Sequence, residues 1–177
     1  FATWDPEAPS LEEYLGNYRW YLDTMFNRRD SGVELIGPTK WTARFNWKLA
    51  SDNFGGDAYH IYISHRSAFI AQGQALGMKE HPGLNMTQSG GQAIHVGNGH
   101  GLGMQLFDND EEIFYNFNNN VPPIQEYEKA ILPEVERRLG SLRARRVLNI
   151  HGNIFPHASL LWPQVNGTIR LWQPRGP

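Results

Sequence analysis

The sequence contains no cysteine among its 177 residues. This absence excludes disulfide bonds, thiolate metal sites, iron–sulfur clusters held by cysteine, and cysteine nucleophiles. A metal ion bound by this chain must therefore use nitrogen and oxygen ligands.

An excess of charge of either sign is also missing, because 16 basic and 18 acidic residues leave a net charge of −2. This balance offers no electrostatic attraction to nucleic acid. No apolar run is long enough to span a membrane and no secretory leader opens the chain, so we expect a cytoplasmic protein without membrane association. Apolar residues make up 40% and charged residues only 19%, which is typical of a single globular domain.

Hydrophobic periodicity predicts an α+β domain with an antiparallel sheet. Ser10 and Glu13 form a capping box that predicts a helix over 10–26, and Pro122 and Gly140 bound a second helix over 122–139 in which Pro133 predicts a kink. Helical spacing over 47–68 is interrupted by glycines, and a loop follows over 72–91. Alternating patterns predict strands at 33–36, 41–47, 93–96, 102–107, 113–117, 146–155, 159–165 and 168–172.

Polar side chains gather within the segment 53–65. Asn53, Asp57 and His60 are separated by four and then three residues, so on a helix they form one stripe. His65 lies five residues past His60 and shares a metal ion with it only if the helix bends or ends between them. Two imidazoles with one carboxylate suit iron(II) that activates dioxygen. The alternative, that both histidines only form hydrogen bonds beneath a helix, remains open on spacing alone.

The stretch 46–60 reads Asn-Trp-Lys-Leu-Ala-Ser-Asp-Asn-Phe-Gly-Gly-Asp-Ala-Tyr-His, and four residues separate it from His65. It resembles the active-site motif of the Rieske-type aromatic-ring-hydroxylating oxygenase large (alpha) subunits, in the naphthalene dioxygenase-like group. The resemblance implies that His60 and His65 are iron ligands. It also implies that Asp57 carries electrons arriving from the Rieske cluster of a neighbouring subunit, and that Asn53 lies close to the iron.

The resemblance continues into the later part of the chain. The run from His151 to Pro156 is similar to a strand of the family in which a His-x-Asn pair, here His151 and Asn153, lines the substrate pocket. Without the resemblance, this pair is as readily a satisfied buried pair. Four residues are apolar enough to line a pocket for an aromatic substrate, although such residues are more often plain core: Phe54, Leu160, Leu161 and Trp162. Leu160 and Leu161 are the weaker candidates.

The family's parts are not all present. The cysteine and histidine pairs of its amino-terminal Rieske domain are absent, and its third iron ligand, an aspartate in a carboxyl-terminal helix, has no counterpart here. The acidic run Asp108, Asp110, Glu111 and Glu112 is typical of a solvated turn. We therefore expect residues 1–177 to be a partial catalytic domain of a longer protein, inactive by itself, with an incomplete helix-grip fold of the START-like type.

The resemblance implies a dioxygenase that adds both atoms of O2 to an aromatic ring as a cis-dihydroxyl. Electrons would come from NAD(P)H through a reductase, usually a ferredoxin, and the 2Fe–2S Rieske cluster to a mononuclear Fe(II). A small beta subunit and homo-oligomerisation of the large subunit are further expectations. Two alternatives stay open: a Rieske-type monooxygenase or demethylase, and a non-enzymatic helix-grip protein that binds hydrophobic ligands. Three polar groups facing one cavity, Asp57, His60 and His65, argue against the second.

Overall fold

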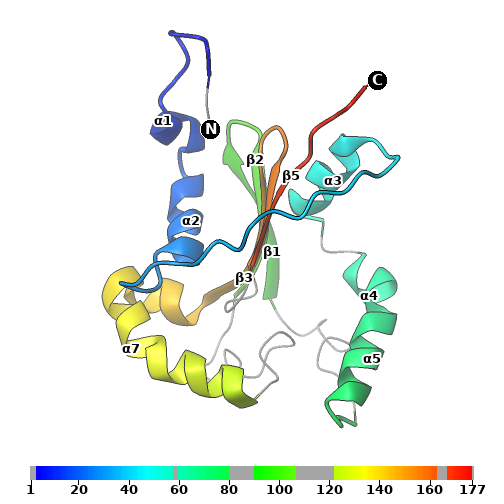
Figure 1. Ribbon diagram of the computed structural model, residues 1–177. Coiled ribbons are helices and arrows are strands. Elements are labelled where there is room, and N and C mark those ends of the chain that lie inside the picture. Colours follow the sequence, from blue (N-terminus) through cyan, green and yellow to red (C-terminus); the bar gives the residue numbers. More distant parts are fainter. Residues whose placement is uncertain (1–2, 58–59, 80–89, 107–121, 163–166, 177) are drawn as a thin grey trace.

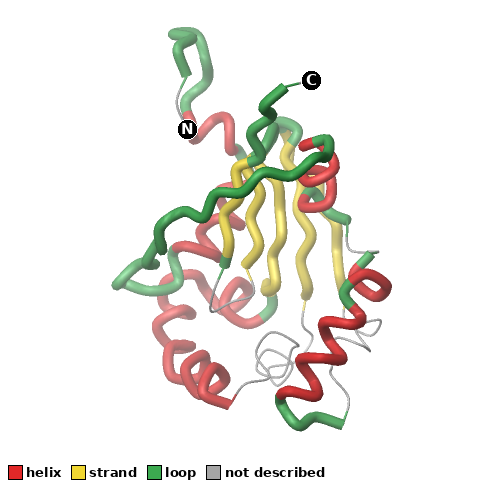
Figure 2. Tube along the Cα trace, turned by 45° about the vertical axis from the view of Figure 1, so that its right-hand side comes forward, coloured by secondary structure: helices red, strands yellow, loops and turns green. Residues whose placement is uncertain are grey.

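The computed structural model describes residues 3–57, 60–79, 90–106, 122–162 and 167–176. Within them, an antiparallel sheet contains five strands in sequential order: β1 Gly90–Gly97, β2 His100–Leu106, β3 Val147–Ile154, β4 Ala158–Trp162 and β5 Thr168–Leu171. On one side of the sheet lie the helices α1 Leu11–Leu15, α2 Tyr18–Phe26 and α7 Pro122–Arg145, and on the other lies α3 Trp47–Phe54, followed by α4 Ile61–Ser64 and α5 Arg66–Ala75 (Figures 1 and 2). The predicted α+β class with an antiparallel sheet is confirmed.

The sheet has a core face, which packs against α1 and α2. Leu102, Gly152, Leu160 and Ile169 are in register across β2 to β5 and share this face. The buried side chains of the sheet and of these two helices form one apolar cluster: Leu15, Tyr18, Met25, Leu102, Met104, Val147, Ile150, Ile154, Ala158 and Leu160. Burial of each large apolar side chain contributes roughly 1.5–3 kcal/mol to stability.

The opposite surface of the sheet, called the site face below, carries Gly103, His151, Leu161 and Thr168 in register. Glycines alternate with apolar residues along β2 because its two faces have different neighbours. A Cβ atom at Gly101 would lie 2.4 Å from the carbonyl oxygen of Gly55, just after α3. Glycine at this position therefore allows the end of α3 to approach the backbone of β2 closely.

The first predicted helix, 10–26, is divided in the structure. The Ser10–Glu13 capping box is present, but Gly16, with a φ of 49°, separates α1 from α2. In the predicted helix over 122–139 the only non-helical φ and ψ angles among the described residues of α7 are at Gly140, so the break lies there and helix resumes up to Arg145. At Pro133, where a kink or a two-part helix was predicted, the φ and ψ angles stay helical.

The strands predicted at 33–36 and 41–47 are also wrong. Residues 31–43 have no regular structure, and α3 begins at Trp47. This extended segment crosses in front of the sheet (Figure 2). In the second predicted strand, two aromatic side chains contact another ring instead of a partner strand: the rings of Trp41 and Phe45 lie 5.8 and 6.1 Å from the Trp172 ring. Alternation here records one-sided aromatic packing and not backbone pairing.

The predicted strands over 93–96, 102–107, 146–155, 159–165 and 168–172 correspond to β1 to β5, with shifted ends. The glycine-rich run 97–101 forms the β1–β2 turn, where Gly97, Asn98 and Gly99 all have positive φ. The strand predicted over 113–117 and the acidic run 108–112 lie outside the described residues. Half of the predicted loop over 72–91, residues 80–89, also lies outside them, while its first residues belong to α5 and its last two to β1. Among the helices described, none has the length and apolar character needed to cross a membrane.

Tyr18 offers a stability test of the core. Its side chain is fully buried, and within the described part of the chain its hydroxyl group has no hydrogen-bond partner. Burial raises the pKa of this phenol. We expect Tyr18→Phe to raise the free energy of unfolding by about 1 kcal/mol, because a buried, unpaired hydroxyl costs about 1–3 kcal/mol. Urea unfolding of both proteins measures the change, and a clear loss of stability would show that the hydroxyl has a partner.

Candidate metal centre

His60 and His65 come together because the helix ends between them. His60 directly precedes α4, and His65 occupies the bend between α4 and α5. Their ring centroids are 5.1 Å apart, with the planes tilted by 55°. An unbroken helix would point residues five apart in different directions. The interruption that a shared metal site requires is therefore present in this chain.

Asp57 and Asn53 surround the ring of His60. The carboxylate oxygen Oδ2 of Asp57 is 3.2 Å from Nδ1 of His60, and the amide nitrogen of Asn53 lies 3.2 Å from Nδ1 and 3.4 Å from Nε2. A carboxylate accepts hydrogen bonds, so with Nδ1–H directed at Asp57 the lone pair of the ring is on Nε2. In this structure Nε2 faces the donating amide of Asn53 at 3.4 Å, and it is the ring atom that would bind a metal ion. Asp57 thus orients the ring and strengthens it as a ligand.

His65 presents its imidazole at the edge of the same group. Its ring lies 6.2 Å from the ring of Phe69, which is buried one turn further along α5. Burial lowers the pKa of His65, and the neighbouring His60 lowers it further. Both influences favour the neutral imidazole, which is the form that binds a metal ion.

His151 approaches this group from the site face of β3. Burial lowers its pKa, His60 lowers it further, and Asp57 opposes the change. Its ring packs over Gly103 of β2, where a Cβ atom would lie 2.3 Å from Cε1. Nε2 of His151 is buried and has no hydrogen-bond partner among the residues described. An unpaired buried nitrogen near His60 and Asp57 is a polar group that a bound molecule could contact.

Gly103→Ala is expected to displace the ring of His151. The new methyl group would occupy space already taken by Cε1 and Nε2, and overpacking of this kind costs roughly 1–3 kcal/mol. A crystal structure of the variant should show a rotated His151 ring, with the α3 segment unchanged. An unmoved His151 ring and unchanged stability of the variant would show that the backbone of the sheet, and not the His151 ring, shifts to accommodate the methyl group.

The predicted pocket residues of the sheet lie in two rows across the site face, one with His151 and Leu161 and the next with Asn153. Leu161 is in register with His151 and is 37% exposed. Asn153 is buried, and its amide is hydrogen-bonded to Ser159 and more distantly to the carbonyl of Pro156. Phe54 is buried at the end of α3. Two further candidates lie on the other side of the sheet: Leu160 belongs to the apolar cluster of the core face, and Trp162 packs against this cluster.

Three residues that the sequence did not single out contact these positions. Ser159 binds Asn153, and both Arg170 and Trp172 contact the ring of Phe54. The hairpin register, which pairs Asn153 with Ser159 and Ser159 with Arg170, brings them together. An assumed hairpin between residues 154 and 158 would have predicted the first of these pairs.

The donor set fits a mononuclear iron, although the described residues do not complete it. Two imidazole nitrogens, with Asp57 orienting one ring, match two of the ligands in a site of two histidines and one carboxylate. Among the described residues no cluster of three or more histidine, aspartate or glutamate side chains is placed to hold a metal ion. The third iron ligand is predicted to lie elsewhere in the full-length protein.

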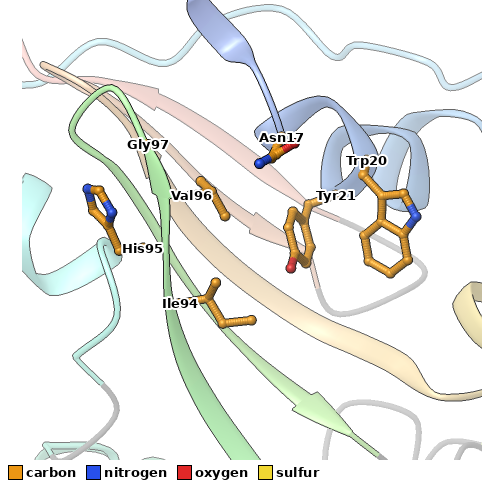
Figure 3. A pocket seen from close by; sticks show the side chains of 7 residues that line it. All are labelled: Asn17, Trp20, Tyr21, Ile94, His95, Val96 and Gly97. Carbon is orange, nitrogen blue, oxygen red and sulfur yellow. The ribbon is translucent and has the colours of Figure 1, made fainter.

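Two hollows lie apart from the histidines. One of about 640 Å³ lies between α2 and β1, where Ile94 and Val96 point toward Tyr21 while His95 points away (Figure 3). A larger one of about 1860 Å³ lies between the extended segment, β4 and β5. Neither has His60, His65 or Asp57 in its lining, so the polar group at the start of α4 is the better candidate for chemistry.

Comparison with known proteins identifies the family. Residues 11–177 match the family model described as the ring hydroxylating alpha subunit (catalytic domain). The chain is 37% identical over its whole length to the biphenyl dioxygenase subunit alpha of Metapseudomonas furukawaii, and 35% identical to the benzene 1,2-dioxygenase subunit alpha of Pseudomonas putida. A solved structure of naphthalene 1,2-dioxygenase with indole bound in the active site matches 96% of this chain with a TM-score of 0.70 and 30% identity.

The chain covers only part of these proteins. It spans 38% and 39% of the two curated relatives, and 37% of the naphthalene 1,2-dioxygenase chain. The structural match agrees with the predicted helix-grip domain, whose antiparallel sheet and helices are described above. The chain therefore belongs to the ring-hydroxylating alpha-subunit family, within its catalytic domain.

Proposed function

We propose that this chain is part of the iron-containing catalytic domain of an aromatic-ring-hydroxylating dioxygenase. The observation that carries the proposal is the meeting of His60 and His65 at the broken helix, with Asp57 on the ring of His60. Two neighbouring imidazoles, one of them oriented by a carboxylate, are suited to binding a metal ion. The same polar groups have no use in a protein that carries apolar ligands.

His60 and His65 would hold a mononuclear Fe(II), which supplies the activation of dioxygen. Asp57 holds the proton on Nδ1 of His60 and is the proposed route for arriving electrons, while the amide of Asn53 lies against the same ring. Phe54, His151, Asn153 and Leu161 are proposed to position an aromatic ring, and the packed sheet beneath them excludes water. The product would carry both oxygen atoms as a cis-dihydroxyl.

The remaining machinery is proposed to lie elsewhere in the full-length protein and its partners. The chain spans 38% of its biphenyl dioxygenase relative, and we infer that residues 1–177 are joined to a Rieske domain and to a segment with the third iron ligand. A reductase and ferredoxin would deliver electrons from NAD(P)H. A small beta subunit, a homo-oligomer of large subunits and a cytoplasmic location complete the proposal.

The test uses the full-length large subunit with its electron-transfer partners and isotopically labelled dioxygen. Biphenyl, benzene and naphthalene are the probes, because the relatives are named for them. A cis-diol that contains two labelled oxygen atoms supports the proposal. A product with one labelled oxygen atom would identify a monooxygenase instead, and tight binding of the probes without labelled product would identify a binding protein.

A further inference from the structure

A buried hydrogen-bond chain crosses the site face from β5 to β3. The indole nitrogen of Trp172 lies 2.7 Å from Oγ of Ser159, and this oxygen lies 2.8 Å from Oδ1 of Asn153. Ser159 is fully buried and Asn153 is only 5% exposed. Hydrogen bonds in such a buried environment have defined partners, because water molecules do not compete for the donors and acceptors.

The two hydrogen bonds of the chain have the same direction. An indole N–H is a donor and never an acceptor, so Oγ of Ser159 accepts from Trp172. The Ser159 hydroxyl in turn donates to Oδ1 of Asn153. This fixes which end of the Asn153 amide faces Ser159. The amide nitrogen then points to the carbonyl oxygen of Pro156, 3.5 Å away, which also accepts a hydrogen bond from Ser51 of α3 at 3.0 Å.

The same tryptophan holds the ring of Phe54. The rings of Trp172 and Phe54 are 6.2 Å apart and tilted by 46°, and the guanidinium of Arg170 lies 4.8 Å from the centre of the Phe54 ring. Arg170 and Trp172 are two residues apart and project from the same face of the chain. Phe54, the last residue of α3, therefore packs against Arg170 of β5 and against Trp172, which directly follows β5.

We propose that Ser159 is a positioning residue of the substrate pocket. By accepting from Trp172 and donating to Asn153, its hydroxyl fixes the indole against Phe54 and fixes the orientation of the Asn153 amide. Ser159 itself is buried beneath these groups and does not reach a bound ring. This inference rests on the proposed function, because it makes Phe54 and Asn153 parts of a pocket.

Ser159→Ala removes one hydroxyl and leaves an indole N–H and an amide carbonyl unpaired in a buried place. The loss of roughly 1 kcal/mol per bond corresponds to about a fivefold change in an equilibrium constant. We expect KM for the aromatic probe to rise about three- to tenfold and the ratio of isomeric diols to change. The value of kcat and the iron content should stay within about twofold, since His60 and His65 are not in the chain of bonds.

The experiment compares Ser159→Ala and Trp172→Phe with the unaltered full-length large subunit, using biphenyl and naphthalene. Thr24→Val is the matched control: Thr24 is 2% exposed on the helical side, and its hydroxyl binds the carbonyl of Trp20. Because Trp172→Phe keeps an aromatic ring but removes the same hydrogen bond as Ser159→Ala, the double variant should raise KM by less than the product of the two single fold-increases. Ultraviolet resonance Raman spectra report the indole hydrogen bond independently of turnover.

A higher KM, a changed isomer ratio and a lost indole hydrogen bond in Ser159→Ala, with none of these in Thr24→Val, support the proposal. A lower melting temperature alone, equal to that of Thr24→Val, would overturn it and leave Ser159 as ordinary core. If the unaltered protein turns over neither hydrocarbon, the proposed function fails. The Raman difference then decides by itself whether Ser159 orients the Trp172 indole.

Discussion

His60→Ala in the full-length large subunit should reduce the bound iron from one atom per catalytic site to almost none. The variant loses the imidazole whose Nε2 lone pair is left available by the Asp57 contact. Loss of a residue that merely orients a metal ligand typically costs roughly 10–100-fold in affinity or activity, and removal of the ligand itself should exceed this. Hydroxylation should fall below detection even with excess Fe(II).

His65→Ala should have the same effect, because its ring is the second imidazole, 5.1 Å from the first. His157→Ala is the matched control, since His157 lies in the turn between β3 and β4 and takes no part in this group. Anaerobic metal analysis and single-turnover product measurements distinguish the variants. Iron that persists at one atom per site in both histidine variants would show that the ligand assignment is wrong.

Arg28→Met should lower the free energy of unfolding by about 3–5 kcal/mol. Arg28 and Glu128 form an ion pair at 2.7 Å between the end of α2 and α7, and their side chains are only 5% and 3% exposed. Removal of one partner of a buried pair leaves an uncompensated charge, and this is the source of the large cost. The double variant Arg28→Met/Glu128→Leu should recover most of the stability, because the isolated carboxylate is also removed.

The loss in Arg28→Met should grow with pH. Burial raises the pKa of Glu128, and Arg28 opposes this increase, so removal of Arg28 should raise the pKa of the carboxyl group further. A carboxyl group whose pKa is raised in the folded state destabilises folding only when it ionises. The variant should therefore approach the unaltered protein below about pH 4, where the carboxyl group is protonated in the unfolded chain too. Urea unfolding at several pH values measures this, and a pH-independent difference would contradict it.

The sequence by itself determined the class of the fold and most of its strands. Their alternation follows from a sheet with one apolar face, so β1 to β5 were predictable from side-chain pattern alone. It also placed Asn53, Asp57, His60 and His65 in one segment. The five-residue spacing of the two histidines showed that they could share a metal ion only if the helix bends or ends between them. The family resemblance supplied their roles, because spacing cannot distinguish a metal ligand from a hydrogen-bonded histidine.

Only the tertiary structure decided on which side of the sheet each side chain lies and which contacts fix its position. The alternation at 41–47 predicted a strand, yet the residues pack on Trp172 because strand pairing needs a free partner edge that no local pattern reveals. The chain from Trp172 through Ser159 to Asn153 joins the end of β5 to β4 and β3, and its bonds link residues 13 and 6 positions apart. Local periodicity specifies the face of an element, whereas contacts across the sheet depend on register and on how closely glycines such as Gly101 and Gly103 allow the layers to approach.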